Sequence, residues 1–242
     1  MIDLHSHILP RLDDGSQSLE ESLAMARLAV ESGVQAMVAT PHCADGRARE
    51  VSDSWQLLRA ALEEMQIPLR VYPGMEILGT AGTVRLLRQG QLITINDSRY
   101  PLMEFPFRAE VRENTEILKS VICAGYRPVI AHPERYECVQ LDPRCINTWH
   151  EMGCLLQVNR GSLLGRFGSA ARDMAFALVD RGFAAVVASD AHSPRMRTPW
   201  LQDVYGMLEE EFSPAAARYL LRRNPKSIIK NEDIPFVKPE WF

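Results

Sequence analysis

The first fifteen residues, MIDLHSHILPRLDDG, contain two histidines, His5 and His7, followed by two adjacent carboxylates, Asp13 and Asp14, all of types that bind metal ions. The apolar start of this stretch predicts a short strand, and side chains two apart in a strand point the same way. His5 and His7 can therefore bind one cation. The loop that follows contains a proline and returns Asp13 or Asp14 toward the strand end, as a second cation would require. We predict a metal site here, with Asp14 as the carboxylate ligand.

Further histidines and carboxylates follow apolar runs along the rest of the chain, each where a strand is expected to end. The carboxyl ends of parallel barrel strands meet at one rim, so donors at these positions converge although they are distant in sequence. A sixth histidine, His150, lies in a predicted helix and is expected to be structural. We predict one metal cluster whose ligands are His5, His7, Asp14, His42, Glu76, Glu104, His132, Asp190 and His192.

This donor set indicates phosphate chemistry. Nine imidazole and carboxylate ligands without a thiolate are too many for one ion and enough for two or three. Three divalent ions, offset by four carboxylates and a bridging hydroxide, would leave a net charge of roughly +1, which attracts a phosphate dianion. The ions would also lower the pKa of bound water toward about 7 and so supply hydroxide for attack on phosphorus. The expected reaction is hydrolysis of a phosphate ester.

Two arginines lie on loops just beyond the ligand-bearing strands, Arg135 in AHPERY and Arg197 in SDAHSPRMR. Each could bind a non-bridging phosphate oxygen through its planar guanidinium. Alternatives remain for several of these side chains. Either arginine could form a surface ion pair, for instance with Glu134; Glu76 could be a helix cap or an ion-pair partner, and Asp190 could be a helix N-cap.

Apolar runs of strand length alternate with helical patterns throughout the chain. Strands are predicted at 1–7, 34–42, 69–76, 101–105, 127–132, 154–159 and 183–192, and helices at 19–33, 51–65, 82–89, 111–125, 145–153 and 171–182. Ser18 and Glu21 form a capping-box pattern at the first helix, and Gly33 ends it. The alternation predicts an α/β fold, a distorted seven-stranded (β/α) barrel in one domain, 1–242. Residues 212–242 are expected to form one or two short helices and a tail that covers the barrel or contacts a neighbour.

The composition limits the partners and the compartment. The chain has 242 residues, 46% hydrophobic and 24% charged, and a net charge of −4 without a basic stripe, so nucleic acid is not an expected ligand. No apolar run approaches the roughly 18 residues that cross a bilayer, and no signal-peptide pattern opens the chain. We expect a cytoplasmic protein that does not insert into membranes. Its five cysteines are scattered and form no CxxC pair, so reduced thiols are expected.

The segments HSHILPRLDDG, ATPH, GMEI, MEF, AHPERY and SDAH resemble the ordered motifs of the polymerase and histidinol phosphatase (PHP) superfamily. Within it, the chain looks most like the bacterial protein-tyrosine phosphatases of CpsB/YwqE type. The resemblance implies a PHP-type barrel in which Arg135 and Arg197 bind the substrate phosphate. Arg11 departs from the glycine or acidic residue common in relatives. The implied trinuclear site has His5, His7, Glu76 and Asp190 on one ion, Glu76, Glu104 and His132 on a second, and Asp14, His42 and His192 on a third.

The same resemblance implies a substrate, a tyrosine-phosphorylated bacterial kinase of capsule or exopolysaccharide synthesis that acts through a Tyr-rich tail. The metal follows instead from the donor set, since imidazoles and carboxylates suit manganese, iron or zinc. We expect three divalent ions, manganese first, with iron or zinc as alternatives. Two other functions stay open: a small-molecule phosphomonoesterase such as a histidinol-phosphate phosphatase, and a metal-binding interaction module without turnover.

Overall fold

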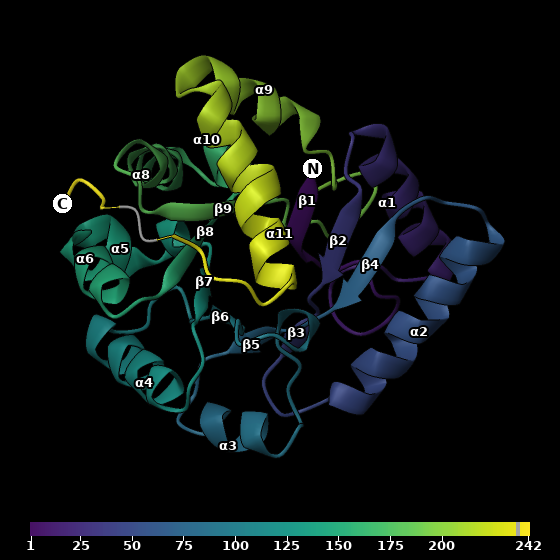
Figure 1. Ribbon diagram of the computed structural model, residues 1–242, viewed down its shortest axis with the longest axis horizontal. Coiled ribbons are helices and arrows are strands. Elements are labelled where there is room, and N and C mark those ends of the chain that lie inside the picture. The colour runs from purple at the N-terminus through teal and green to yellow at the C-terminus, as the bar shows by residue number, and fades with distance from the viewer. Residues whose placement is uncertain (236–237) are drawn as a thin grey trace.

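A parallel barrel forms the centre of the computed structural model, which describes residues 1–235 and 238–242. Helices surround the strands on the outside (Figure 1). Phe236 and Val237, which belong to the predicted C-terminal tail, lie outside the described residues. The strands are β1 (Ile2–Ser6), β2 (Ala36–Ala39), β3 (His42–Cys43), β4 (Arg70–Pro73), β5 (Glu76–Leu78), β6 (Leu102–Glu104), β7 (Val129–Ala131), β8 (Leu155–Asn159) and β9 (Ala184–Ala188).

Two of the seven predicted strands are each divided into two segments. The predicted strand 34–42 becomes β2 and β3, separated at Thr40 and Pro41, and 69–76 becomes β4 and β5, separated at Gly74 and Met75. Proline lacks the N–H that a ladder needs. A Cβ at Gly74 would lie 2.9 Å from a methyl carbon of Val38, so the chain at Gly74 packs closely against the Val38 side chain of β2. These two divided strands distinguish this barrel from a regular one, in which each strand is continuous.

The division also separates the strands into two sheets, ordered β1-β2-β4 and β3-β5-β6-β7-β8-β9, with all pairs parallel. A parallel bridge between Ser6 and Ala191 joins β1 to the chain after β9. The strands therefore follow one another around a closed ring. This arrangement confirms the predicted distorted seven-stranded (β/α) barrel.

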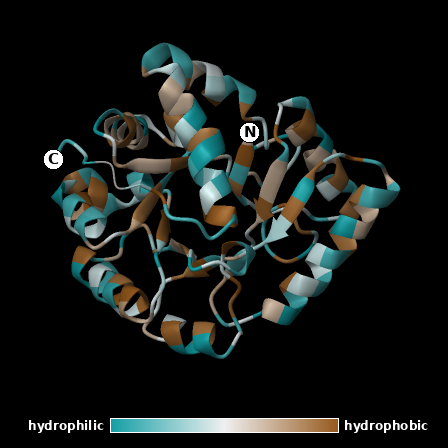
Figure 2. Ribbon diagram, viewed as in Figure 1, coloured by the Kyte–Doolittle hydropathy of each residue, from teal (hydrophilic) through white to brown (hydrophobic). Residues whose placement is uncertain are grey.

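All six predicted helices are present, and hydrophobic and hydrophilic residues alternate along them (Figure 2). Ser18 caps the first helix by accepting from the backbone N–H of Glu21 at 3.2 Å, whereas the Glu21 carboxylate accepts from the N–H of Gln17. The helices are α1 (Leu19–Glu31), α2 (Ala48–Glu64), α3 (Thr83–Arg88), α4 (Val111–Cys123), α5 (Glu137–Leu141), α6 (Arg144–Glu151), α7 (Arg160–Leu163), α8 (Ser169–Asp180), α9 (Gln202–Glu211), α10 (Pro214–Arg218) and α11 (Asn224–Ile229). The remaining helical segments are the 3₁₀ turns η1 (Ile95–Asp97) and η2 (Pro133–Arg135) and the π-helical turn η3 (Tyr219–Arg223).

Alternate residues of the strands belong to two separate apolar clusters. Met37 and Ile130 are in the larger cluster with residues of the outer helices, while their neighbours Val38 and Val129 are in a smaller one. Because successive strand residues face opposite sides, the smaller cluster is the barrel interior. Ile228 of α11 belongs to this interior cluster.

The C-terminal helices close one end of the barrel. Helical structure continues without a break from Pro214 to Ile229, and α11 contacts β1 and β9. The predicted cover over the barrel is thus present, whereas the sequence pattern gave no indication of α9. Among residues 1–235 and 238–242, no helix combines the length and apolar character that a bilayer crossing requires.

Candidate metal centre

An irregularity in β1 places the first two histidines. Between Asp3 and Ser6 this strand has one residue more than its partner β2, where Met37 and Ala39 are the matching positions. Such a bulge redirects side chains locally. His5 lies inside it, and the Nε2 atoms of His5 and His7 are 3.2 Å apart. The predicted pairing of these two imidazoles is therefore present.

Both rings are oriented through their other nitrogen. Nδ1 of His5 lies 2.8 Å from Oε1 of Gln157, an oxygen that also faces the backbone N–H of His132 at 3.4 Å. Nδ1 of His7 lies 2.7 Å from Oδ2 of Asp13. Since these oxygens only accept, both Nδ1 atoms must donate, and in the neutral imidazoles the two Nε2 atoms then face each other with their lone pairs. Two lone pairs at this distance call for a cation between or beside them.

The carboxylate of Glu76 lies at the centre of the group. Its Oε2 is 3.2 Å from Nε2 of His5, 3.3 Å from Nε2 of His7 and 3.0 Å from Nδ1 of His42, yet it has no well-formed hydrogen bond. Its Oε1 lies 2.8 Å from Nε2 of His132. The side chain is fully buried, where an unpaired charge would be costly. An oxygen that faces three imidazole nitrogens fits a carboxylate shared between metal ions.

The outer side of the centre faces solvent. Oδ1 of Asp14 lies 3.6 Å from Nε2 of His42 and 3.4 Å from Nε2 of His192, and the Asp14 side chain is 67% exposed. Oε1 of Glu104 lies 2.8 Å from Nδ1 of His42. This side offers an open approach for a substrate.

All nine predicted ligands converge in overlapping groups whose donor atoms lie within 4.8 Å of one another. Glu104 is grouped with His42 and Glu76, whereas His132 is grouped with His5 and Glu76, so the implied trio Glu76, Glu104 and His132 is not one of the groups. The division of ligands among individual ions stays a prediction. The groups are His7, Asp14, His42 and His192; His5, His7 and Asp190; His5, Glu76 and His132; and His42, Glu76 and Glu104.

Asp190 connects the imidazoles to the arginines. Its Oδ1 lies 3.4 Å from Nε2 of His7 and 3.5 Å from Nδ1 of His192. Its Oδ2 accepts from Nδ2 of Asn159 and from the guanidinium of Arg197. The next helix, α9, begins only at Gln202, so Asp190 is not the helix N-cap considered as an alternative. Asp190 has a φ of +51°, a strained conformation for a residue other than glycine that is common at functional sites.

Arg135 also points to this carboxylate, with Nη1 3.5 Å from Oδ2 of Asp190. The alternative ion pair between Arg135 and Glu134 is absent. Glu134 is instead buried, and its Oε1 accepts from the backbone N–H of Asn159 at 3.0 Å and from the hydroxyl of Ser162 at 2.6 Å. Both predicted arginines therefore lie beside the cluster.

The charges of the centre are strongly coupled. Burial opposes protonation of His42, but its contacts with Glu104 and Glu76 raise its pKa to about 10. Burial and the neighbouring His7 lower the pKa of His192 to about 4. Burial would raise the pKa of Glu76, but the surrounding imidazoles, His5 foremost, hold it well below its ordinary value. Without metal, protons take the place of cations among these ligands.

Three residues of the site have roles that the sequence pattern does not indicate. Asp13 orients His7, Gln157 orients His5, and Asn159 donates to Asp190. For Asp13 the pattern indicates only an alternative to Asp14 as a ligand. A polar residue inside the apolar run CLLQVN was the one available signal for Gln157.

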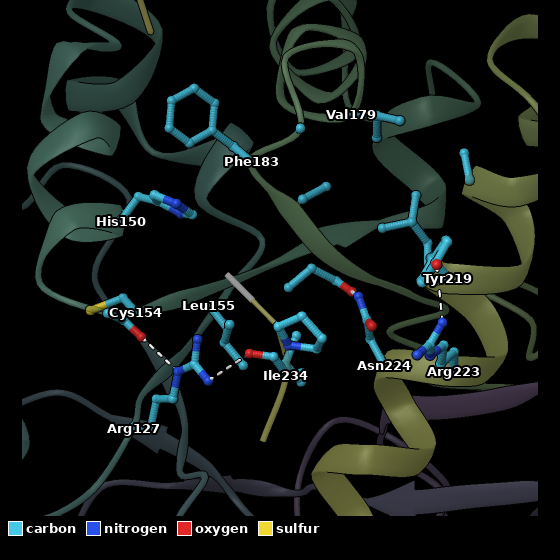
Figure 3. Close-up of a pocket in the computed structure, with 17 residues that line it drawn as sticks. Arg127, His150, Cys154, Leu155, Val179, Phe183, Tyr219, Arg223, Asn224 and Ile234 are labelled. Carbon is cyan, nitrogen blue, oxygen red and sulfur yellow. Dashed lines mark hydrogen bonds between the residues drawn. The ribbon is translucent and has the colours of Figure 1, made fainter. Parts of the chain in front are cut away.

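A separate cavity of about 430 Å³ lies at the opposite end of the strands (Figure 3). Leu155 and Ala184, the first residues of β8 and β9, line it together with Phe183 and residues of the C-terminal helices. None of the predicted ligands or phosphate-binding arginines is among its lining residues. His150 is in the lining, and its ring contacts Phe183 and Trp241 as expected for a structural side chain. The chemistry therefore belongs to the carboxyl ends of the strands.

Known proteins match this chain over nearly its full length. The tyrosine-protein phosphatase YwqE of Bacillus subtilis is 36% identical over 241 residues, which cover 97% of this chain and 93% of that protein. One solved structure comes from work on YwqE and on CpsB from Streptococcus pneumoniae, described as unique metal-dependent tyrosine phosphatases. It matches this chain with a TM-score of 0.94 and 35% sequence identity, and the match covers 100% of this chain and 99% of the other. A candidate histidinol phosphatase from Listeria monocytogenes matches over 79% of this chain and 95% of its own, at a TM-score of 0.51 and 11% identity, which shows a shared fold.

The family described as capsular polysaccharide synthesis, CpsB/CapC, matches residues 1–230. That span includes every predicted ligand and both arginines. The resemblance inferred from the short motifs is confirmed, and so is the PHP-like fold. This chain belongs to the CpsB/CapC family.

Proposed function

We propose that this chain is a metal-dependent protein-tyrosine phosphatase that acts in capsular polysaccharide synthesis. Relatives that match it over nearly the full length are named tyrosine-protein phosphatases. The observation that carries the proposal is the meeting of two imidazole Nε2 atoms, those of His5 and His7, with the fully buried carboxylate of Glu76. A buried carboxylate oxygen that faces two imidazole nitrogens in this way fits a ligand set for metal ions.

The proposed ligands are the nine side chains named above, and they hold three divalent ions, with manganese expected first. Ions held there would supply a coordinated water with its pKa lowered toward about 7 and positive charge to offset that developing on the phosphoryl oxygens. Arg135 and Arg197 bind non-bridging oxygens of the phosphoryl group, while Asp190 orients both guanidiniums. Glu76 and Asp190 stay ionised because their pKa values are held low.

None of the five cysteines belongs to the groups of donor side chains found among the described residues, so we assign them no part in the reaction. For two of them, Cys145 and Cys154, burial also raises the pKa to about 12, the opposite of what a thiolate nucleophile requires. The proposed nucleophile is water, which attacks phosphorus in line, and no side chain becomes phosphorylated. The departing phenolate is a good leaving group, so little proton donation is needed.

For the natural substrate we propose a tyrosine-phosphorylated bacterial kinase of capsule or exopolysaccharide synthesis, recognised at its Tyr-rich tail. The support for this substrate is the family description, which places the chain in capsular polysaccharide synthesis. The open approach beside Asp14 and His42 suits a peptide segment better than an enclosed small molecule.

The test compares chelator-stripped protein with the same protein reloaded with manganese. We expect hydrolysis of a phosphotyrosyl peptide only after reloading, with slower hydrolysis of a phosphoseryl peptide and of histidinol phosphate. A higher kcat/KM for histidinol phosphate would favour the small-molecule phosphomonoesterase. Metal uptake without turnover of any of these esters would favour the interaction module and overturn the proposal.

A further inference from the structure

The guanidinium of Arg135 is held between two phenyl rings. Its Cζ lies 4.2 Å from the ring centre of Phe167 and 4.6 Å from that of Phe107. The Cζ of Arg197 lies 5.9 Å from the same Phe167 ring. Stacking on aromatic faces fixes the plane of a guanidinium. Phe167 therefore restrains both arginines of the site.

Both guanidiniums are directed at the metal centre by one carboxylate oxygen. Oδ2 of Asp190 accepts from Arg197 and lies 3.5 Å from Nη1 of Arg135. Oδ1 of the same carboxylate faces the imidazoles of His5 and His7 at 3.6 and 3.4 Å. A ring that holds the guanidiniums against Asp190 also sets where their free N–H groups meet a phosphoryl group.

A glycine makes room for the Phe167 ring. A Cβ at Gly161, in α7, would lie 2.5 Å from Cε2 of Phe167, closer than carbon atoms can approach. The φ of Gly161 is not in the left-handed region, so its backbone does not require glycine. The absence of a side chain at Gly161 therefore allows the Phe167 ring to pack against the backbone of α7. The ring's position beside the arginines is a specific feature of the packing.

Phe107 differs from Phe167 in its exposure. One face of the Phe107 ring lies against Arg135, and the residue remains 43% exposed. Its ring centre is 6.0 Å from that of His132, so it lies at the edge of the metal centre. An exposed phenyl ring beside a phosphate site offers a flat apolar surface to the ring of an aryl phosphate.

We propose that Phe107 and Phe167 form an aromatic clamp around Arg135 that recognises aryl phosphates. Phe167 is a positioning residue that holds Arg135 and Arg197 for the phosphoryl group. Phe107 contacts the aryl part of the substrate. The clamp rests on the proposed phosphatase function and adds the residues that select phosphotyrosine over alkyl esters.

The positioning role is tested on manganese-loaded, full-length protein by calorimetric titration with inorganic phosphate. Phe167→Ala is expected to weaken phosphate binding by about tenfold without changing the metal content, and Phe167→Tyr is expected to restore it. The matched control is Phe176→Ala on α8, where Arg172 stacks over Phe176 at 5.0 Å outside the site. Unchanged phosphate affinity in Phe167→Ala, or an equal loss in the control, would overturn the role.

Gly161→Ala displaces the Phe167 ring without changing Phe167 itself. It should weaken phosphate binding in the wild-type background but have little further effect in a Phe167→Ala background, because the ring it displaces is already gone. Additive losses in the double variant would contradict the proposed coupling. This cycle keeps the test valid if either single variant loses some stability.

The substrate contact is tested by comparing para-nitrophenyl phosphate with glycerol 2-phosphate. Phe107→Ala also removes one of the two rings that stack on Arg135, so some loss of inorganic phosphate affinity is expected. Beyond that common loss, KM should rise by about 3- to 10-fold more for the aryl ester than for glycerol 2-phosphate. Equal effects on both esters would overturn the contact. A wild-type protein that binds phosphate but hydrolyses neither ester would refute the phosphatase function, while the phosphate titrations would still decide the positioning role of Phe167.

Discussion

The two ends of the barrel differ in how their polar groups are paired. At the amino ends of the strands, the polar side chains around the cavity bond to the protein itself. Arg127 donates to the carbonyl oxygens of Gly153 and Ile234, and Asn224 donates to that of Ala185 (Figure 3). At the carboxyl ends, Oε2 of Glu76 is buried without a well-formed hydrogen bond.

This difference separates groups that serve the fold from groups reserved for a ligand. Buried polar atoms in folded proteins are nearly always paired, so unpaired ones need an explanation. The apolar cavity is the more obvious concavity, but two of the polar side chains that line it, Arg127 and Asn224, already donate to backbone carbonyls. The carboxyl end has polar atoms whose partners must come from outside the chain. Unsatisfied bonding capacity identifies the site better than cavity size does.

Removing the central carboxylate should have the greatest effect on activity. In Glu76→Gln, the amide keeps the size of the side chain but cannot be shared between cations, so metal content should fall. We expect kcat/KM to fall by more than about 100-fold, because loss of even an outer partner of a metal ligand costs 10–100-fold. Metal analysis and assays with manganese check both results. Glu116→Gln, on the exposed surface of α4, is the control, and normal turnover by Glu76→Gln would contradict the cluster.

Removing the charge of Asp13 should have a smaller and reversible effect. Its carboxylate orients His7, and although burial opposes ionisation, that contact lowers the pKa of Asp13 to about 2. Asp13→Asn should weaken manganese binding by about 10–100-fold, with activity restored by excess metal. Activity titrated against free manganese measures the shift. The control is Asp45→Asn, which removes an exposed ion pair with Arg47 and should leave the manganese dependence of activity unchanged. If saturating metal fails to rescue Asp13→Asn, Asp13 is more than an orienting residue.

The carboxyl end of the metal-free protein should also respond to pH. The pKa of His42 is raised to about 10, so this group contributes stability that is complete below about 6.5 and is lost as the pH rises through 10. Stripped protein should therefore become less stable to denaturant between pH 6.5 and pH 10. Manganese binding at pH 7 should release protons from His42, detected by titration calorimetry in buffers of different ionisation enthalpy. No buffer dependence would contradict a protonated His42.

The sequence predicted those features of the site that depend on local pattern. Apolar runs that close on His132 or Glu104 predicted both a strand and a donor side chain at its end, and Ser18 predicted the start of α1. The bulge around His5 was not predictable, because it depends on register with β2. The division of strands at Pro41 also depends on which neighbour each half pairs with.

Roles that depend on distance were likewise outside the reach of the sequence. Gln157 orients His5 from a strand far along the chain, and Phe167 meets Arg135 across two loops. Nothing in the spacing of these residues indicates that they touch. Helix α9 escaped prediction because its buried residues, Val204 and Leu208, make only a short apolar stripe.

A substitution at the amino end should change stability alone. Leu155→Ala shortens a buried side chain that already borders the cavity, so the free energy of unfolding should fall by about 2 kcal/mol, the low end for such changes. Denaturant unfolding measures this loss, and kcat/KM with saturating manganese should stay at the wild-type value. The same strand, β8, carries Gln157 and Asn159 at its other end, where they hold His5 and Asp190. If Leu155→Ala lowered manganese affinity as Asp13→Asn does, the strand would transmit strain from one end to the other, and the two ends would not be separable.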